Sequence, residues 1–139
     1  EGVSITKPNL IDLKEFVAAS LETDEDRIAA CRKLAADGRA EIVALTLGDQ
    51  GALLVTAERT WRALPLRIDA VSTVGAGDSF VGGLVAALAG GKPLDEAFRV
   101  AVAAASAAVM MPGTGLCQPE DVKRLLREVK IKEIARALV

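Results

Sequence analysis

Residues 72–83 read Ser72-Thr73-Val74-Gly75-Ala76-Gly77-Asp78-Ser79-Phe80-Val81-Gly82-Gly83. The stretch is a glycine turn that leads directly into an apolar, alanine-rich segment with the pattern of a helix. Glycine lets the backbone take conformations closed to other residues, and it lets another group approach the main chain closely. The N–H groups of such a turn and of the first helical turn are free to bind a phosphate. The stretch therefore predicts an anion site at a helix N-terminus.

Asp78 falls at the expected start of this helix, where a carboxylate can cap the helix and lie beside a bound anion. A carboxylate next to a phosphate site is the minimum requirement for activating a hydroxyl nucleophile. A capped helix after an ordinary glycine turn explains the same residues. Taken alone, residues 75–78 favour that structural interpretation.

The composition excludes several classes of protein. The chain has 139 residues, the length of one domain, and 51% of them are hydrophobic. No apolar run reaches the roughly 18 residues of a membrane span, so a soluble protein is expected. The formal net charge is −2, from 17 interleaved basic and 19 acidic residues, and aromatic residues make up 3%. This leaves neither a basic face nor a stacking surface for nucleic acid. There is no histidine, and the two cysteines lack metal-ligand spacing, which excludes zinc sites and histidine-based triads.

The pattern of apolar residues and of start and stop signals predicts alternating strands and helices. Strands are expected at residues 3–6, 42–47 and 52–56, with an edge strand within 58–66; helices are expected at 10–19, 23–37, 78–89, 94–110 and from 119. The strand at 42–47 is almost wholly apolar, as in a strand covered on both faces. Trp61 is interpreted as a packing residue. The apolar residues of the tail 130–139 leave open whether the tail docks or frays.

Three further segments flank the central stretch: Lys7-Pro8-Asn9, Thr46-Leu47-Gly48-Asp49-Gln50-Gly51 and Pro112-Gly113-Thr114-Gly115-Leu116-Cys117. Read separately, they are a strand end before an N-cap, a plain hairpin turn and a loop of small residues. Together with the run from Ser72 to Ser79 they resemble the C-terminal half of the PfkB (ribokinase-like) carbohydrate kinases. The likeness covers nearly the whole chain and is greatest to the minor, PfkB-type 6-phosphofructokinases.

The resemblance implies a three-layer α/β/α fold of the ribokinase type, with a mostly parallel sheet and a β-hairpin. Residues 1–139 would be its nucleotide-binding C-terminal part, and the sugar-binding and lid part is expected before Glu1. Glycine turns of such a sheet gather at the edge where ligands of open α/β sheets bind.

The resemblance also assigns roles to single residues. Asp78 would be the catalytic base, and the anion hole would be formed by the N–H groups of Gly75, Ala76 and Gly77. The nucleotide would be bound by Lys7, Asn9, Thr46, Gly48, Gly51, Val102 and Ser106. A monovalent cation would be held, mostly through backbone oxygens, by Ser72, Val74, Ala108, Met111, Gly113 and Gly115. Met111 and Gly115 differ from the closest phosphofructokinase pattern, which has Asn and Arg there, so backbone ligation is expected to survive and side-chain contacts are not.

The implied function is the ATP-dependent phosphorylation of fructose 6-phosphate to fructose 1,6-bisphosphate, with Mg²⁺ and with K⁺ as a further ion. Alternatives are a 1-phosphofructokinase, a tagatose-6-phosphate kinase or another sugar or nucleoside kinase of the family. A non-catalytic nucleotide-binding module is the alternative of a different class, and Asp78 argues against it, because a binder has no reason to keep a carboxylate beside an anion. A cytoplasmic enzyme is expected, homodimeric at full length and with no nucleic-acid or membrane partner, whereas this chain alone is expected to be inactive.

Overall fold

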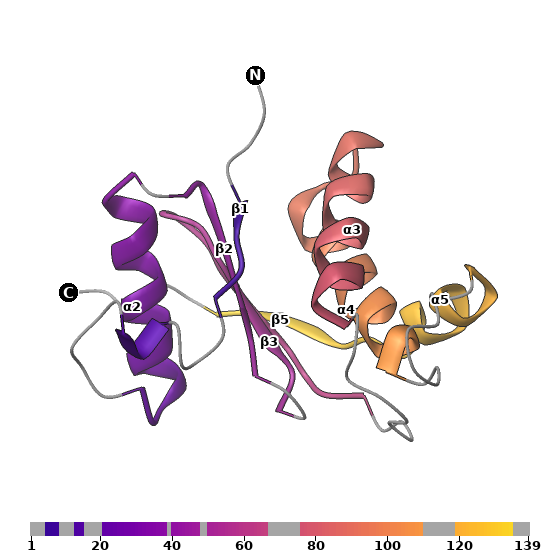
Figure 1. The fold of residues 1–139 in the computed structure, drawn as a ribbon, viewed down its shortest axis with the longest axis horizontal. Helices are drawn as coiled ribbons and strands as arrows, with labels where there is room; N and C mark the ends of the chain where they lie inside the picture. Colours follow the sequence, from indigo (N-terminus) through magenta and orange to yellow (C-terminus); the bar gives the residue numbers. More distant parts are fainter. Residues whose placement is uncertain are drawn as a thin grey trace. The chain divides into compact units, whose positions relative to one another are not determined.

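The computed structural model describes residues 5–8, 13–15, 21–38, 40–47, 50–66, 76–109 and 119–134. Residues 13–15 are helical. The other elements, in chain order, are β1 (Ile5–Thr6), α2 (Asp24–Ala36), β2 (Ile42–Thr46), β3 (Ala52–Val55), β4 (Thr60–Ala63), α3 (Ala76–Ala89), α4 (Leu94–Val109), α5 (Pro119–Leu126) and β5 (Ile131–Glu133) (Figure 1). Among the described helices, none is long and apolar enough to cross a membrane.

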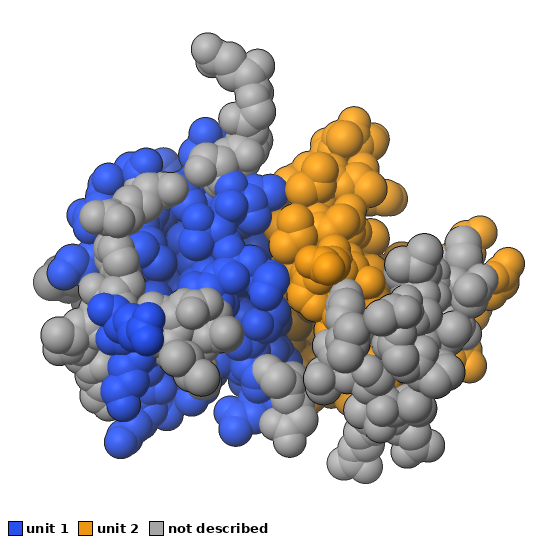
Figure 2. Space-filling view, viewed as in Figure 1, with its two compact units in different colours: residues 1–62, 132–139 blue, residues 63–131 orange. Residues whose placement is uncertain are grey.

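The chain divides into two compact units, coloured separately in Figure 2. Unit 1 consists of residues 1–62 and 132–139, and unit 2 of residues 63–131. Unit 1 contains α2 and most of the sheet, whereas unit 2 contains α3, α4 and α5.

The strands form one sheet in the order β1-β2-β3-β4-β5. β1 pairs with β2 in parallel, with Ile5 opposite Ile42, and β2 pairs with β3 in antiparallel, with Val43 opposite Val55. The connections from β2 to β3 and from β3 to β4 are too short for the crossover that parallel pairing needs. The prediction of a mostly parallel sheet is therefore wrong for the described strands, which form a mixed sheet.

β4 was expected to be an edge strand, and this prediction is also wrong. β4 lies between β3 and β5, so the tail of the chain supplies the neighbouring strand. Ile134 N donates to Thr60 O at 2.8 Å, and Leu64 N donates to Lys130 O at 3.0 Å. The two sequences run in opposite directions in these pairs, so β4 and β5 are antiparallel. The tail docks up to residue 134.

The core of unit 1 lies between α2 and one face of the sheet. α2 buries Ile28, Cys31 and Leu34 against alternate residues of β2 and β3, among them Val43, Leu45, Leu53 and Val55. The intervening residues Ile42, Ala44 and Leu54 are buried as well. Both faces of these two strands are therefore covered, as the apolar run at 42–47 predicts.

The ends of α2 follow from its sequence. The Thr23 side chain accepts a hydrogen bond from Asp26 N at 3.2 Å and so caps the first turn. The helix ends where Gly38 takes a φ of 75°, a conformation that glycine adopts at little cost. Two arginines then join the helix to β4: Arg62 Nε lies 3.0 Å from Asp24 Oδ2, and the Arg32 guanidinium donates to Thr60 Oγ1 at 3.1 Å.

Trp61 is 3% exposed, which confirms that it packs in the core. The Arg59 guanidinium lies 4.6 Å from the centre of its ring, and the same group donates two hydrogen bonds to the Glu133 carboxylate, at 2.7 and 2.9 Å. The hydrogen bonds from Arg59 lower the pKa of Glu133 below its usual value of 4.5. Because this pair is exposed, it secures the pairing of β4 with β5 more by geometry than by charge.

In unit 2, α3 and α4 form a helical hairpin. The connection of residues 90–93 is closed by a Schellman motif: Lys92 N donates to Ala87 O at 3.1 Å, and Gly91 N donates to Leu88 O at 3.0 Å. The rings of Phe80 and Phe98 meet edge to face with their centres 6.1 Å apart. Arg99 of α4 donates to the carbonyl of Leu126 at 3.0 Å and so satisfies the last residue of α5.

α3 begins two residues earlier than predicted, at Ala76, and ends at Ala89 as predicted. α4 also has the predicted bounds within one residue. On α4, Phe98 and Val102 are buried, whereas Ala105 and Val109 are only half-buried. The buried side is rich in alanine, including Ala97, Ala101, Ala104 and Ala108. Small side chains on this side let the neighbouring helix come close.

Candidate active site

The first turn of α3 presents the predicted anion-binding groups. Ala76 and Gly77 are the first two residues of the helix, and Asp78 is the acidic residue of its first turn. The N–H groups of a first turn have no acceptor within the helix, and they carry the positive end of the helix dipole. Asp78 is exposed, whereas Phe80, two residues on, is 2% exposed and anchors the helix. The turn therefore offers free amides and an accessible carboxylate on a fixed support.

The last turn of α4 lies at the same end of the helical pair. Only residues 90–93 connect α3 to α4, and an added Cβ at Gly83 in the middle of α3 would meet Ala101 and Ala104 in the middle of α4. The helices therefore run antiparallel, with the start of α3 beside the end of α4 (Figure 1). Asp78 and Ala108 are 30 positions apart in the sequence. The antiparallel arrangement of α3 and α4 brings them to the same end of the helical pair.

The predicted base contacts lie one turn apart on α4. Val102 is 7% exposed and lies in the core, whereas Ser106 is half-buried. Residues i and i+4 share a helix face, so Val102 and Ser106 point the same way. Of the two, Ser106 has the surface that a ligand can touch.

Ala108 meets the requirement for a backbone cation ligand. It lies within the last four residues of α4, whose carbonyls have no partner within the helix. The negative end of the helix dipole also favours a cation there. An alanine side chain has no ligand atom, so the carbonyl is the group that Ala108 can offer; the residue as a whole is 1% exposed.

In unit 1 the described nucleotide contacts of the prediction lie at the carboxyl ends of the strands. Lys7 follows β1 directly, and Thr46 is the last residue of β2. Because β1 and β2 are parallel and Thr6 lies opposite Val43, both residues are at the carboxyl ends of their strands. Both side chains are half-buried, with surface left for a ligand. Ligands of open α/β sheets bind outside the carboxyl ends of the strands.

The turn from β2 to β3 brings Gly51 to the same end of the strands. Leu47 N donates to Gly51 O at 2.9 Å and Gln50 N donates to Leu47 O at 3.0 Å, which closes the turn. Gly51 has a φ of 96°, where a side chain would be strained. The glycine is thus required by the backbone, whether or not the turn contacts a nucleotide.

The other predicted site residues lie outside the described part of the chain. They are Asn9, Gly48, Ser72, Val74, Gly75, Met111, Gly113 and Gly115. The described residues contain no group of three or more acidic, histidine or cysteine side chains that could hold a metal ion. A protein cage for Mg²⁺ is thus absent from that part, and Mg²⁺ ordinarily binds nucleotide phosphates with only one or two carboxylates.

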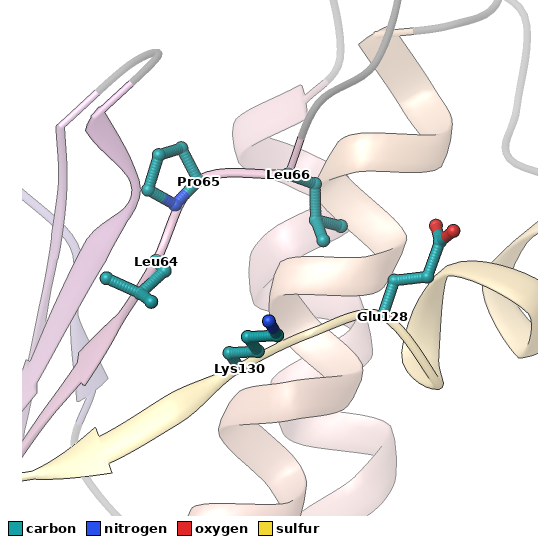
Figure 3. A pocket seen from close by; sticks show the side chains of 5 residues that line it. All are labelled: Leu64, Pro65, Leu66, Glu128 and Lys130. Carbon is teal, nitrogen blue, oxygen red and sulfur yellow. The ribbon is translucent and has the colours of Figure 1, made fainter.

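A separate pocket in unit 2 is lined by Leu64, Pro65, Leu66, Glu128 and Lys130 (Figure 3). It lies where the chain leaves β4 and where α5 leads into β5. Leu64 is 47% exposed there. Its described lining includes none of the predicted site residues.

Sequence reasoning did not single out Gly83, at which α3 lies directly against α4. A Cβ on Gly83 would lie 3.1 Å from Ala104 Cβ and 3.3 Å from Ala101 Cα. The sequence has a glycine inside one predicted helix and many alanines in the next. This pattern is compatible with close helix packing, but it does not say which residues are in contact.

Solved structures of sugar kinases share this fold. The structure of Escherichia coli phosphofructokinase-2 with potassium has a TM-score of 0.83 at 37% sequence identity, over 90% of this chain and 40% of the other. Ribokinase from Thermotoga maritima has a TM-score of 0.76 at 27% identity, over 89% of this chain and 42% of the other. The fold is therefore ribokinase-like α/β, as predicted.

Residues 1–121 match the profile of the pfkB family of carbohydrate kinases, and the chain belongs to this family. It is 39% identical to the ATP-dependent 6-phosphofructokinase isozyme 2 of Mycobacterium tuberculosis over 123 residues. These residues are 88% of this chain and 36% of the relative. It is also 35% identical to the 1-phosphofructokinase of Escherichia coli over 128 residues. These residues are 92% of this chain and 41% of the relative. The chain thus spans about two fifths of the length of these relatives.

Proposed function

We propose that this chain is the nucleotide-binding C-terminal part of an ATP-dependent phosphosugar kinase that phosphorylates the C1 hydroxyl of fructose 6-phosphate. The observation that carries the proposal is the exposed carboxylate of Asp78 in the first turn of α3, directly after the amides of Ala76 and Gly77. The name of the Mycobacterium tuberculosis relative supports the substrate. The longer polypeptide in which this chain would act is called the complete kinase below.

In this proposal Asp78 accepts the proton of the sugar hydroxyl as that hydroxyl attacks. The N–H groups of Gly75, Ala76 and Gly77 would hold the negative charge that develops on the transferred group, and those of Ala76 and Gly77 are fixed in α3 and need no reorganisation. Phosphoryl transfer depends mainly on such positioning and charge stabilisation. ATP would supply the phosphoryl group and leave as ADP, and Mg²⁺ bound with it would neutralise part of the phosphate charge.

The nucleotide would be bound by Lys7, Asn9, Thr46, Gly48, Gly51, Val102 and Ser106. Lys7 and Thr46 support this assignment by their places at the carboxyl ends of β1 and β2. K⁺ would be held by backbone oxygens of Ser72, Val74, Ala108, Met111, Gly113 and Gly115, and the unpaired helix-end carbonyl of Ala108 fits that role. A homodimeric complete kinase is part of the same proposal.

A 1-phosphofructokinase is the second candidate, because the Escherichia coli enzyme of that name is 35% identical to this chain. The two activities differ in the sugar, and the residues proposed here bind the nucleotide and the transferred group. Comparing fructose 6-phosphate, fructose 1-phosphate and tagatose 6-phosphate as substrates of the complete kinase separates these candidates.

The substitution Asp78→Asn in the complete kinase tests the proposal. It keeps the size and most of the hydrogen bonding of the side chain and removes the charge and the proton acceptor. We expect kcat to fall by about 10²–10⁴-fold, the usual contribution of a positioned general base. The affinity for ATP should stay the same or improve, because a negative charge leaves the phosphate site.

Asp95→Asn is the matched control. Asp95 also lies in the first turn of a helix, α4, but at the opposite end of the helical pair. It should leave kcat within about twofold. Near-normal kcat in Asp78→Asn, or joint loss of folding and ATP binding, would show that Asp78 is a structural cap, and the chain would then be a nucleotide-binding module without this catalytic base.

A further inference from the structure

Gly83 and Gly82 are neighbours in the middle of α3, yet their surroundings differ. A Cβ on Gly83 would lie 3.1 Å from Ala104 Cβ, 3.3 Å from Ala101 Cα and 3.4 Å from Val100 O, all on α4. A Cβ on Gly82 would meet no atom within 4 Å. Two of the three contacts at Gly83 are to backbone atoms, which cannot rotate away. The missing side chain of Gly83 therefore sets how closely α3 approaches α4.

This contact lies close to the proposed catalytic groups. Gly83 is five residues from Asp78, about 7.5 Å along the axis of α3, and Ala104 is four residues from Ala108, about 6 Å along α4. A helix is stiff over such a length, so a shift at Gly83 is carried to its first turn. A side chain at residue 83 would push the two helices apart by a few tenths of an ångström.

We propose that Gly83 is a positioning residue for phosphoryl transfer. By letting α3 pack directly on the backbone of α4, it holds the Asp78 carboxylate and the amides of Ala76 and Gly77 at a fixed place relative to the last turn of α4. Gly83 acts through the helix and touches no reacting atom. This inference rests on the function proposed above.

The experiment compares Gly83→Ala with Gly82→Ala in the complete kinase. A misplacement of about 1 Å can cost 10²-fold in rate, so a shift of tenths of an ångström should lower kcat by roughly 3- to 20-fold in Gly83→Ala. Gly82→Ala adds the same methyl group to the same helix in open space and should leave kcat within about twofold. The KM for ATP should change less than kcat, because the proposed base contacts lie on α4.

Rescue separates positioning from a loss of folding. Ala104→Gly removes the atom that a Cβ at residue 83 would meet first, at 3.1 Å. The double variant Gly83→Ala/Ala104→Gly should recover part of the lost kcat, because the closest contact is removed while those to Ala101 Cα and Val100 O remain, although both substitutions together need not restore the melting temperature. All rates are measured well below the melting temperature of each variant and per folded enzyme, so that a purely structural defect does not change them.

Equal kcat in Gly83→Ala and Gly82→Ala overturns the inference, and so does a loss that Ala104→Gly does not reduce. Asp78→Asn is assayed in parallel. If Asp78→Asn loses activity while Gly83→Ala does not, only the positioning role is wrong. If Asp78→Asn keeps its activity, the proposed function itself is wrong, and this inference is overturned with it.

Discussion

Cys31 lies in the core between α2 and the sheet and is fully buried. Burial disfavours the charged thiolate and raises the pKa of the Cys31 thiol to about 12. Since the thiolate is the reactive form, Cys31 is expected to be unreactive in the folded chain at neutral pH. In the unfolded chain its usual pKa of 9.0 applies. Its burial therefore favours the folded state fully below pH 9, and this contribution is lost as the pH rises toward 12.

Thiol labelling checks this expectation. A variant with Cys117→Ser, in which Cys31 is the one remaining thiol, should react with iodoacetamide only after denaturant is added. Rapid labelling of the native variant at pH 7 would contradict the burial of Cys31.

At the scale of an element, the helix termini lead to testable predictions. The first concerns Gly91, at the end of α3. Gly91 has a φ of 84°, where an L side chain is strained. Gly91→Ala should lower the free energy of unfolding by about 1 kcal/mol, because the cost of that conformation exceeds the stabilisation that comes from the lower entropy of the unfolded variant. Gly90→Ala is the control, because its Cβ would lie at an ordinary 3.5 Å from its neighbours. Urea unfolding should show a loss for Gly91→Ala alone, and equal stability of the two variants would contradict the Schellman closure.

The last turn of α4 gives the second expectation. If the carbonyl of Ala108 and its proposed partners hold K⁺, the rate of the complete kinase should rise several-fold when K⁺ replaces Na⁺ at constant ionic strength. A parallel series with choline separates a requirement for K⁺ from inhibition by Na⁺. Equal rates in all three salts would remove the cation from the proposal, although Asp78 would keep its proposed role.

Among the elements, the helices were predicted well because their signals are local. Thr23 and Gly38 mark the ends of α2, and Gly91 marks the end of α3, through side chains and φ angles within a few residues. The sheet was predicted less well, because pairing depends on residues far apart in the chain. Nothing in the sequence of β5 says that it pairs with β4, and that pairing made β4 an inner strand.

At the scale of the whole molecule, the sequence proposed residues for the candidate site but did not say which elements hold them. The structure confirms that Asp78 lies in a first helical turn, that Lys7 directly follows a strand and that Thr46 ends the strand parallel to it. Their roles toward a ligand stay predictions. The contact of Gly83 with α4 could not be predicted from the sequence, because it depends on where the two helices cross and not on the sequence of either helix alone.

The last prediction concerns binding by the chain as a whole. The proposed nucleotide contacts include Lys7, Thr46 and Gly51 of unit 1, and Val102 and Ser106 of unit 2. The residues that would bind the sugar are expected outside this chain. Purified 1–139 should therefore bind a fluorescent ATP analogue, yet show no turnover of fructose 6-phosphate in a coupled assay in which the complete kinase is the positive control. Binding should persist in Asp78→Asn, since the carboxylate serves the reaction and not the nucleotide. Turnover by the 139-residue chain would mean that the sugar site lies within it, and the proposed role as a nucleotide-binding part would then be wrong.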